Sequence, residues 1–144
     1  MRPLLARLCQ DRSGNPLIEL GLVAPFVVAL ILGVIDFGRG TYASMSLSSA
    51  ARAGAEFVSR TGNTDTLTQV VASAANLREA ELTVTPVVFC ECTHGVEQAC
   101  TEPCGGGNRQ YVSVEVKQPF STLVPYPLIS NPMTLSARAV LRVK

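Results

Sequence analysis

The hydrophobic and polar positions of this chain divide it into a long apolar run, a helical stretch and several alternating stretches. Residues 17–35 carry a single charge, Glu19, and are long enough for a tilted helix to cross a bilayer. Over residues 41–60 the apolar side chains recur every three to four positions, and Ala, Ser and Gly let another element approach closely. The pattern predicts one long helix over residues 15–60, with Gly62 as its left-handed cap.

A shorter helix and three strands are predicted to follow. Asn63 or Thr64 can cap the second helix. Its apolar face carries Leu67, Val70, Val71, Ala74 and Leu77. The period then changes to two, in stretches around residues 82–89, 111–117 and 133–143, which is typical of strands. Three strands with one apolar face need a cover, and the two helices can supply it, so we expect an α+β fold with a small antiparallel sheet.

A proline-rich crossover joins the second and third of these strands. Its prolines are Pro119, Pro125, Pro127 and Pro132, with apolar side chains among them. One interpretation is a connection whose apolar side chains cap the core. The other is a contact surface for a neighbouring subunit, and the sequence leaves both open.

Composition and charge narrow the function classes. The 144 residues have a formal net charge of +1 and form no basic patch, so a nucleic-acid partner has little support. There is no Trp, and the one histidine, His94, has no second histidine to help it bind a metal. No phosphate loop or nucleophile–base pair is visible, so we expect no enzymatic activity, no cofactor and no metal.

The charges that flank the apolar run predict its orientation. The leader, residues 1–14, carries three arginines against one acid, whereas Asp36 and Arg39 cancel just after the run. The positive-inside bias places the N-terminus in the cytoplasm. In a bacterial inner membrane, the C-terminal domain would then be periplasmic.

Cysteine usage agrees with an exported domain. Cys9 lies in the leader, whereas Cys90, Cys92, Cys100 and Cys104 cluster in the part expected outside the cytoplasm, where disulfides persist. Zinc binding and free redox thiols are the alternatives. Cys90 and Cys92 lie on one face of a strand, too far apart for an easy mutual bond. Of the three possible pairings, we therefore expect one in which each of them bonds Cys100 or Cys104, and we favour the nested arrangement, Cys90–Cys104 with Cys92–Cys100, over the other.

Four motifs occur together around the apolar run. They are Arg12-Ser13-Gly14, Glu19-Leu20-Gly21-Leu22-Val23-Ala24-Pro25, Gly33-Val34-Ile35-Asp36-Phe37-Gly38-Arg39 and Ala50-Ala51-Arg52-Ala53-Gly54-Ala55. In this combination the chain resembles the TadE/TadG-like pilus assembly proteins, which are minor-pilin-like components of tight-adherence (type IVc) pili. The short chain is more similar to the TadE type.

The resemblance implies a pilin-like fold and a pilin-like maturation. A prepilin peptidase would cut after Gly14 and leave Asn15 as the mature N-terminus. Glu19 would engage the new amine of a neighbouring subunit during assembly and so set the helix register. The alternative is that the Glu19 side chain only reaches the lipid headgroups. The implied partners are other pilins or pseudopilins, the peptidase, the inner-membrane assembly platform and membrane lipid.

The sequence thus predicts three regions. They are a cytoplasmic leader (1–14), a transmembrane and extended amphipathic helix (15–60), and an exported α+β domain (61–144) with a Cys-rich loop (90–104). The expected function is a minor pilin or pseudopilin that supports or primes pilus assembly; the alternative is a membrane-anchored periplasmic binding or adhesive module. Secretion after Ala43 and an uncleaved anchor are the competing fates of the N-terminus.

Overall fold

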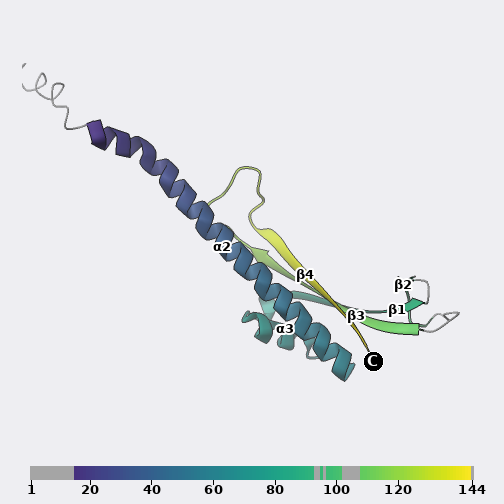
Figure 1. Ribbon diagram of the computed structural model, residues 1–144. Helices are drawn as coiled ribbons and strands as arrows, with labels where there is room; N and C mark the ends of the chain where they lie inside the picture. The colour runs from purple at the N-terminus through teal and green to yellow at the C-terminus, as the bar shows by residue number, and fades with distance from the viewer. Residues whose placement is uncertain (1–14, 93–94, 96, 102–107, 144) are drawn as a thin grey trace, which may run out of the picture. The chain divides into compact units, whose positions relative to one another are not determined.

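A computed structural model describes residues 15–92, 95, 97–101 and 108–143 of the chain (Figure 1). The chain divides into two compact units, an N-terminal unit of residues 1–38 and a C-terminal unit of residues 39–144. The boundary falls inside the helix α2 (Asn15–Thr61). The helix therefore contributes its apolar first part to one unit and its remainder to the other.

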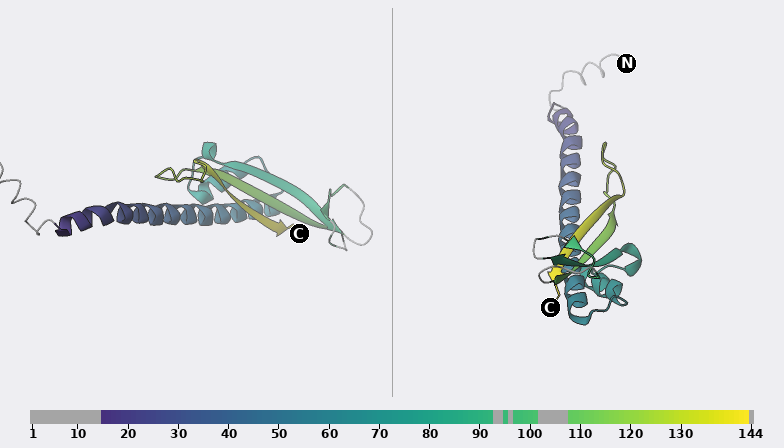
Figure 2. Two further views of the ribbon diagram at one scale, coloured as in Figure 1. Left: turned by 90° about the horizontal axis from the view of Figure 1, so that it is seen from above. Right: turned by 90° about the vertical axis from the view of Figure 1, so that its right-hand side faces the viewer.

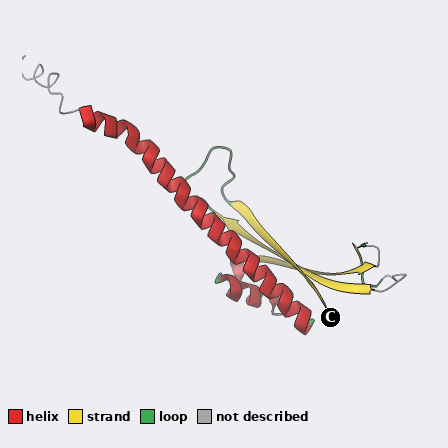
Figure 3. Cartoon of the chain, viewed as in Figure 1, coloured by secondary structure: helices red, strands yellow, loops and turns green. Residues whose placement is uncertain are grey.

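The other elements all belong to the C-terminal unit (Figure 3). They are α3 (Leu67–Ala75), the 3₁₀ turn η2 (Glu79–Glu81), β1 (Thr83–Cys92), β2 (Glu97–Gln98), β3 (Asn108–Phe120) and β4 (Met133–Arg142). The strands form one antiparallel sheet in the order β2-β1-β3-β4. The α+β class, with a long first helix, a short second helix and a small antiparallel sheet, is confirmed.

The end of α2 and the start of α3 test the two helix caps that the sequence predicts. Gly62 has a φ of 66°, and its N–H donates to the carbonyl oxygen of Val58 at 2.9 Å, so the predicted left-handed cap is confirmed. The predicted cap of the second helix is wrong. The Asn63 side chain instead accepts a 2.7 Å hydrogen bond from the N–H of Asp65, a local turn that competes with capping, and α3 follows a Thr66 that makes no capping side-chain bond.

The strand register follows the period-two pattern. β1 pairs with β3 from Thr83↔Lys117 to Cys92↔Asn108, and β3 pairs with β4 along ten positions. The three predicted strands are therefore confirmed, and the middle one is longer than its alternation indicated. The fourth strand, β2, was not predicted, because two residues are too few to show a period.

The core of the C-terminal unit lies between the sheet and the two helices. Alternate residues of β3 are fully buried, as expected for one face of a strand. The core consists of Val112, Val114, Val116 and Ala139 from the sheet, Leu47, Ala50, Ala51, Ala55 and Val58 from α2, and Leu67, Val71 and Ala75 from α3. Figure 2 shows the second half of α2 running along the sheet. The prediction that both helices cover the sheet is confirmed.

The N-terminal unit has a different surface. Along residues 17–35 nearly every side chain of α2 is exposed, including large ones such as Leu17, Phe26 and Ile31. Within the described part of the chain, α2 is the one helix long and apolar enough to cross a membrane. Because contiguous exposed apolar surface of this extent is unfavourable in water, this half of the helix indicates a single-pass membrane anchor.

Candidate functional site

The predicted assembly residue Glu19 lies near the start of the described helix. It follows Asn15, the first described residue, by four positions, which is about one helical turn. The Glu19 side chain is exposed, as are its neighbours Ile18 and Leu20. A carboxylate is thus presented on an otherwise apolar helical surface. Gly14, the other side of the predicted peptidase junction, lies outside the described residues.

The C-terminal unit begins where the apolar run has ended, and the end of β3 packs there. The guanidinium carbon of Arg39 lies 5.4 Å from the centroid of the Phe120 ring, a cation–π geometry. A Cβ atom on Gly40 would lie 3.7 Å from Cζ of the same ring. Phe120 therefore fixes the beginning of the proline-rich crossover against the first residues of the unit. The sequence did not predict this contact, because a single Phe after a strand carries no periodic signal.

The predicted cysteine cluster contains a disulfide between Cys90 and Cys100, whose Cα atoms are 4.9 Å apart. Cys92 is also disulfide-bonded, and Cys104 lies outside the described residues. The formation of disulfides is confirmed for this pair, which is therefore not a pair of zinc-binding thiolates. The expectation that Cys90 bonds Cys100 or Cys104, and not Cys92, is confirmed, whereas the favoured nested pairing, Cys90–Cys104 with Cys92–Cys100, is wrong.

The reason is the unpredicted strand β2. The N–H of Gly95 donates to the carbonyl oxygen of Cys92 at 2.9 Å, so the chain reverses as soon as β1 ends. β2 then pairs Cys90 with Gln98, and Cys100 follows two residues later, within bonding reach of Cys90. The pairing depends on this register, which the cysteine spacing alone does not give.

The rest of the cysteine loop gives no metal-binding cluster in the part that is described. Residues 93–94, 96 and 102–107 lie outside the described residues, and His94 is among them. Elsewhere in the described chain, no group of three His, Cys, Asp or Glu side chains is arranged to hold a metal ion.

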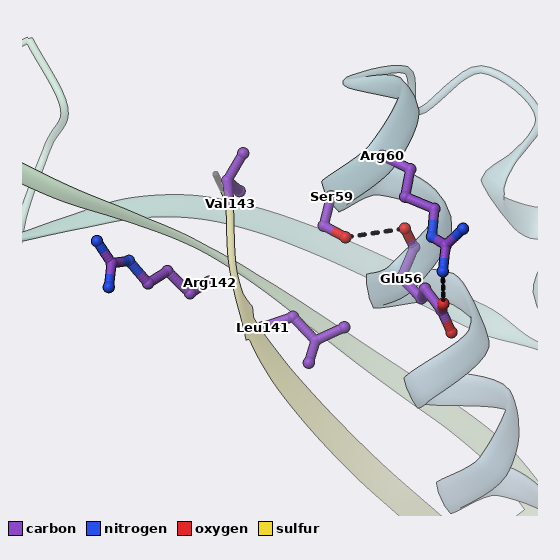
Figure 4. Close-up of a pocket in the computed structure, with 6 residues that line it drawn as sticks. All are labelled: Glu56, Ser59, Arg60, Leu141, Arg142 and Val143. Carbon is purple, nitrogen blue, oxygen red and sulfur yellow. Dashed lines mark hydrogen bonds and ion pairs between the residues drawn. The ribbon is translucent and has the colours of Figure 1, made fainter.

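One open pocket of about 770 Å³ lies in the C-terminal unit, between the end of α2 and the end of β4 (Figure 4). It is lined by Glu56, Ser59, Arg60, Leu141, Arg142 and Val143. The polar groups from α2 are engaged within their own helix: Arg60 pairs with the Glu56 carboxylate, as the four-residue spacing favours, and the Ser59 hydroxyl donates to the Glu56 carbonyl oxygen. These six residues supply no histidine, and their one hydroxyl is not aimed at a base.

The proline-rich crossover, residues 121–132, is partly exposed. Phe120, Val124 and Tyr126 are half-buried, but Leu123, Leu128 and Ile129 are exposed. The core-capping interpretation therefore fails for these last three side chains. Each of them exposes apolar side-chain surface on the C-terminal unit.

Together, the apolar exposed first part of α2 and the small α+β unit that follows it suggest a protein with a single-pass membrane anchor. Residues 17–56 match the family described as TadE-like protein. This match spans the apolar run and most of the core-forming part of α2, and it confirms the resemblance to TadE-like pilus assembly proteins for that segment. It supports a role associated with Tad pili in general. No curated protein and no solved structure matches the chain.

Proposed function

We propose that this chain is a non-enzymatic minor pilin or pseudopilin that supports or primes assembly of a tight-adherence pilus. The observation that carries the proposal is α2, one helix of 47 residues whose first part is apolar and exposed and whose second part contributes to the core of a domain. The match to TadE-like proteins falls on this helix. A helix of this kind can anchor the subunit in the membrane and later pack against equivalent helices of other subunits.

The proposed orientation has the N-terminus in the cytoplasm and the C-terminal unit in the periplasm. It is supported by the three arginines of the leader, since cytoplasmic flanks carry an excess of basic residues. It is also supported by the Cys90–Cys100 disulfide, which persists in an oxidising compartment. In this orientation a prepilin peptidase acting at the cytoplasmic face cuts between Gly14 and Asn15.

Glu19 then sets the register between neighbouring helices. A lone carboxylate is unfavourable within the apolar layer, by about 2.5–3.5 kcal/mol if it reaches the bilayer centre. The new amine of Asn15 lies four residues before Glu19, a rise of about 6 Å along the helix. A parallel neighbour displaced by about this rise brings its amine level with the carboxylate. The pair neutralises both charges, and a displacement of another size leaves them unpaired.

The test compares the natural chain with Glu19→Ala in the native host, measuring the mature N-terminus by sequencing and pili by electron microscopy. We expect both proteins to begin at Asn15 when the prepilin peptidase is present and at Met1 when it is deleted. We expect pili to be lost in Glu19→Ala, because the buried amine of the neighbour then has no partner.

The matched control is Glu79→Ala, which removes an exposed carboxylate from the C-terminal unit and should leave piliation unchanged. A natural protein that begins at Met1 or Ser44 in the presence of the peptidase contradicts the proposed maturation. Normal piliation by Glu19→Ala contradicts the assembly role. The latter result favours a membrane-anchored binding module, for which the exposed apolar crossover is the specific observation.

A further inference from the structure

We propose that the proline-rich crossover, residues 121–132, is a second membrane contact that inserts its apolar tip into the interfacial layer of the bilayer. The inference rests on α2 being a membrane anchor and not on the role in pilus assembly. It concerns where the C-terminal unit lies while the subunit is still in the membrane.

The tip of the crossover presents apolar side chains in an unusual backbone conformation. The N–H of Ile129 donates to the carbonyl oxygen of Tyr126 at 3.3 Å, which closes a turn with Pro127 and Leu128 at its centre. Leu128 has a φ of 76° and a relative exposure of 105%. Glycine or asparagine is usual at such a position. At this position a leucine has a strained backbone, and its exposed side chain is not buried by the rest of the chain. A strained backbone without compensation inside the chain points to burial of this side chain against a partner outside it.

The composition of the crossover suits a lipid surface. Its twelve residues contain no Asp, Glu, Lys, Arg or His. Pro125, Pro127 and Pro132 have no N–H that would need a partner outside water. Tyr126 adds an aromatic side chain of the kind that is enriched at membrane interfaces.

The position of the crossover puts a bilayer within reach. Phe120, immediately before it, packs on Gly40 and lies under the Arg39 guanidinium. The apolar run ends at residue 35, so residues 39 and 40 follow its end by about one helical turn. The crossover therefore begins beside residues that follow the apolar run by about one helical turn, and this short separation along α2 is what brings a bilayer within its reach.

The test uses the absence of tryptophan from the natural chain. Leu128→Trp and, separately, Ile129→Trp place a single fluorophore in the tip of the full-length protein. The control, Thr64→Trp, places it on an exposed turn after the far end of α2, about 33 Å along the helix from residue 39. Each protein is reconstituted in vesicles of phosphatidylcholine and phosphatidylglycerol, with and without acyl-chain bromination near the headgroup.

We expect a blue-shifted emission from both tip variants and quenching by brominated lipid several-fold greater than for Thr64→Trp. Vesicle flotation of all three proteins establishes that α2 is inserted, and unchanged reactivity of their thiols establishes that the disulfides are intact. Solvent-like, unquenched emission from both tip variants overturns the proposal. So does a blue shift that brominated lipid does not quench and that grows with protein density, because this result indicates a second subunit. Equal quenching of Thr64→Trp also overturns it, because the contact is then not specific to the crossover.

Discussion

At the scale of single residues, Gly54 permits the close packing of α3 against α2 in the core of the C-terminal unit. A Cβ atom at this position would lie 2.7 Å from Cγ2 of Val71 and 3.2 Å from Cδ1 of Leu67. Both of these contacts come from α3, and both side chains are buried. The absence of a side chain at Gly54 is therefore what lets α3 rest on α2.

We expect Gly54→Ala to destabilise the C-terminal unit. Alanine improves helix propensity by about 1 kcal/mol, but overpacking a filled core costs about 1–3 kcal/mol, and Val71 is too short to move its methyl group aside. The net loss should be about 1 kcal/mol. It is measured as a lower midpoint of thermal unfolding, followed by circular dichroism of the full chain in detergent.

Gly40→Ala is the matched control on the same helix. Its added methyl group would meet Phe120 at an ordinary 3.7 Å, so the midpoint should stay the same or rise. Equal midpoints for the two alanine variants would contradict the steric argument. The sequence indicated that the Ala- and Gly-rich stretch permits close approach, but it could not identify Gly54 as the contact, because that depends on where α3 crosses.

At the scale of elements, the sequence predicted those helices and strands whose apolar residues repeat at a regular spacing. The long helix, its Gly62 cap and three strands could be predicted, because the spacing of apolar residues within each segment, together with local residue chemistry, determines its secondary structure. The start of α3, the strand β2 and the Cys90–Cys100 bond do not. They depend on a competing side-chain turn at Asn63 and on a two-residue register, neither of which leaves a repeating signal.

The disulfide register can be tested with two variants that each keep two of the four cysteines Cys90, Cys92, Cys100 and Cys104. Cys92→Ser/Cys104→Ser keeps Cys90 and Cys100, and we expect these two to be oxidised, because the β1–β2 hairpin holds them together. A bond closing this ten-residue separation contributes about 2–3 kcal/mol. Maleimide labelling of the denatured protein, followed by mass measurement, counts the free thiols.

The comparison variant is Cys92→Ser/Cys100→Ser, which keeps Cys90 and Cys104. We expect the thiols of Cys90 and Cys104 both to label, because Cys90 has lost its partner Cys100. Oxidised Cys90 in this variant, together with reduced Cys90 in the first one, would restore the pairing that cysteine spacing alone had favoured.

At the scale of the whole molecule, the two parts of α2 are suited to different environments. Its first part exposes apolar side chains that need lipid, whereas five of the core residues, from Leu47 to Val58, come from its second part. A domain boundary at the end of the helix would therefore divide the core. The boundary between the two compact units, after residue 38, leaves that core intact.

Two fragments follow from this argument and test it. A fragment of residues 39–144, directed to the periplasm, should be soluble and monomeric and should unfold cooperatively, because it keeps α2 against the sheet and discards the apolar run. A fragment of residues 62–144 should aggregate. It exposes the face that contains Val112, Val114 and Val116, and burial of apolar surface contributes about 25 cal/mol per Å². Size-exclusion chromatography and thermal unfolding distinguish the two fragments. A soluble, cooperative 62–144 fragment would show that the sheet and α3 suffice as a core, and that α2 only carries the domain to the membrane.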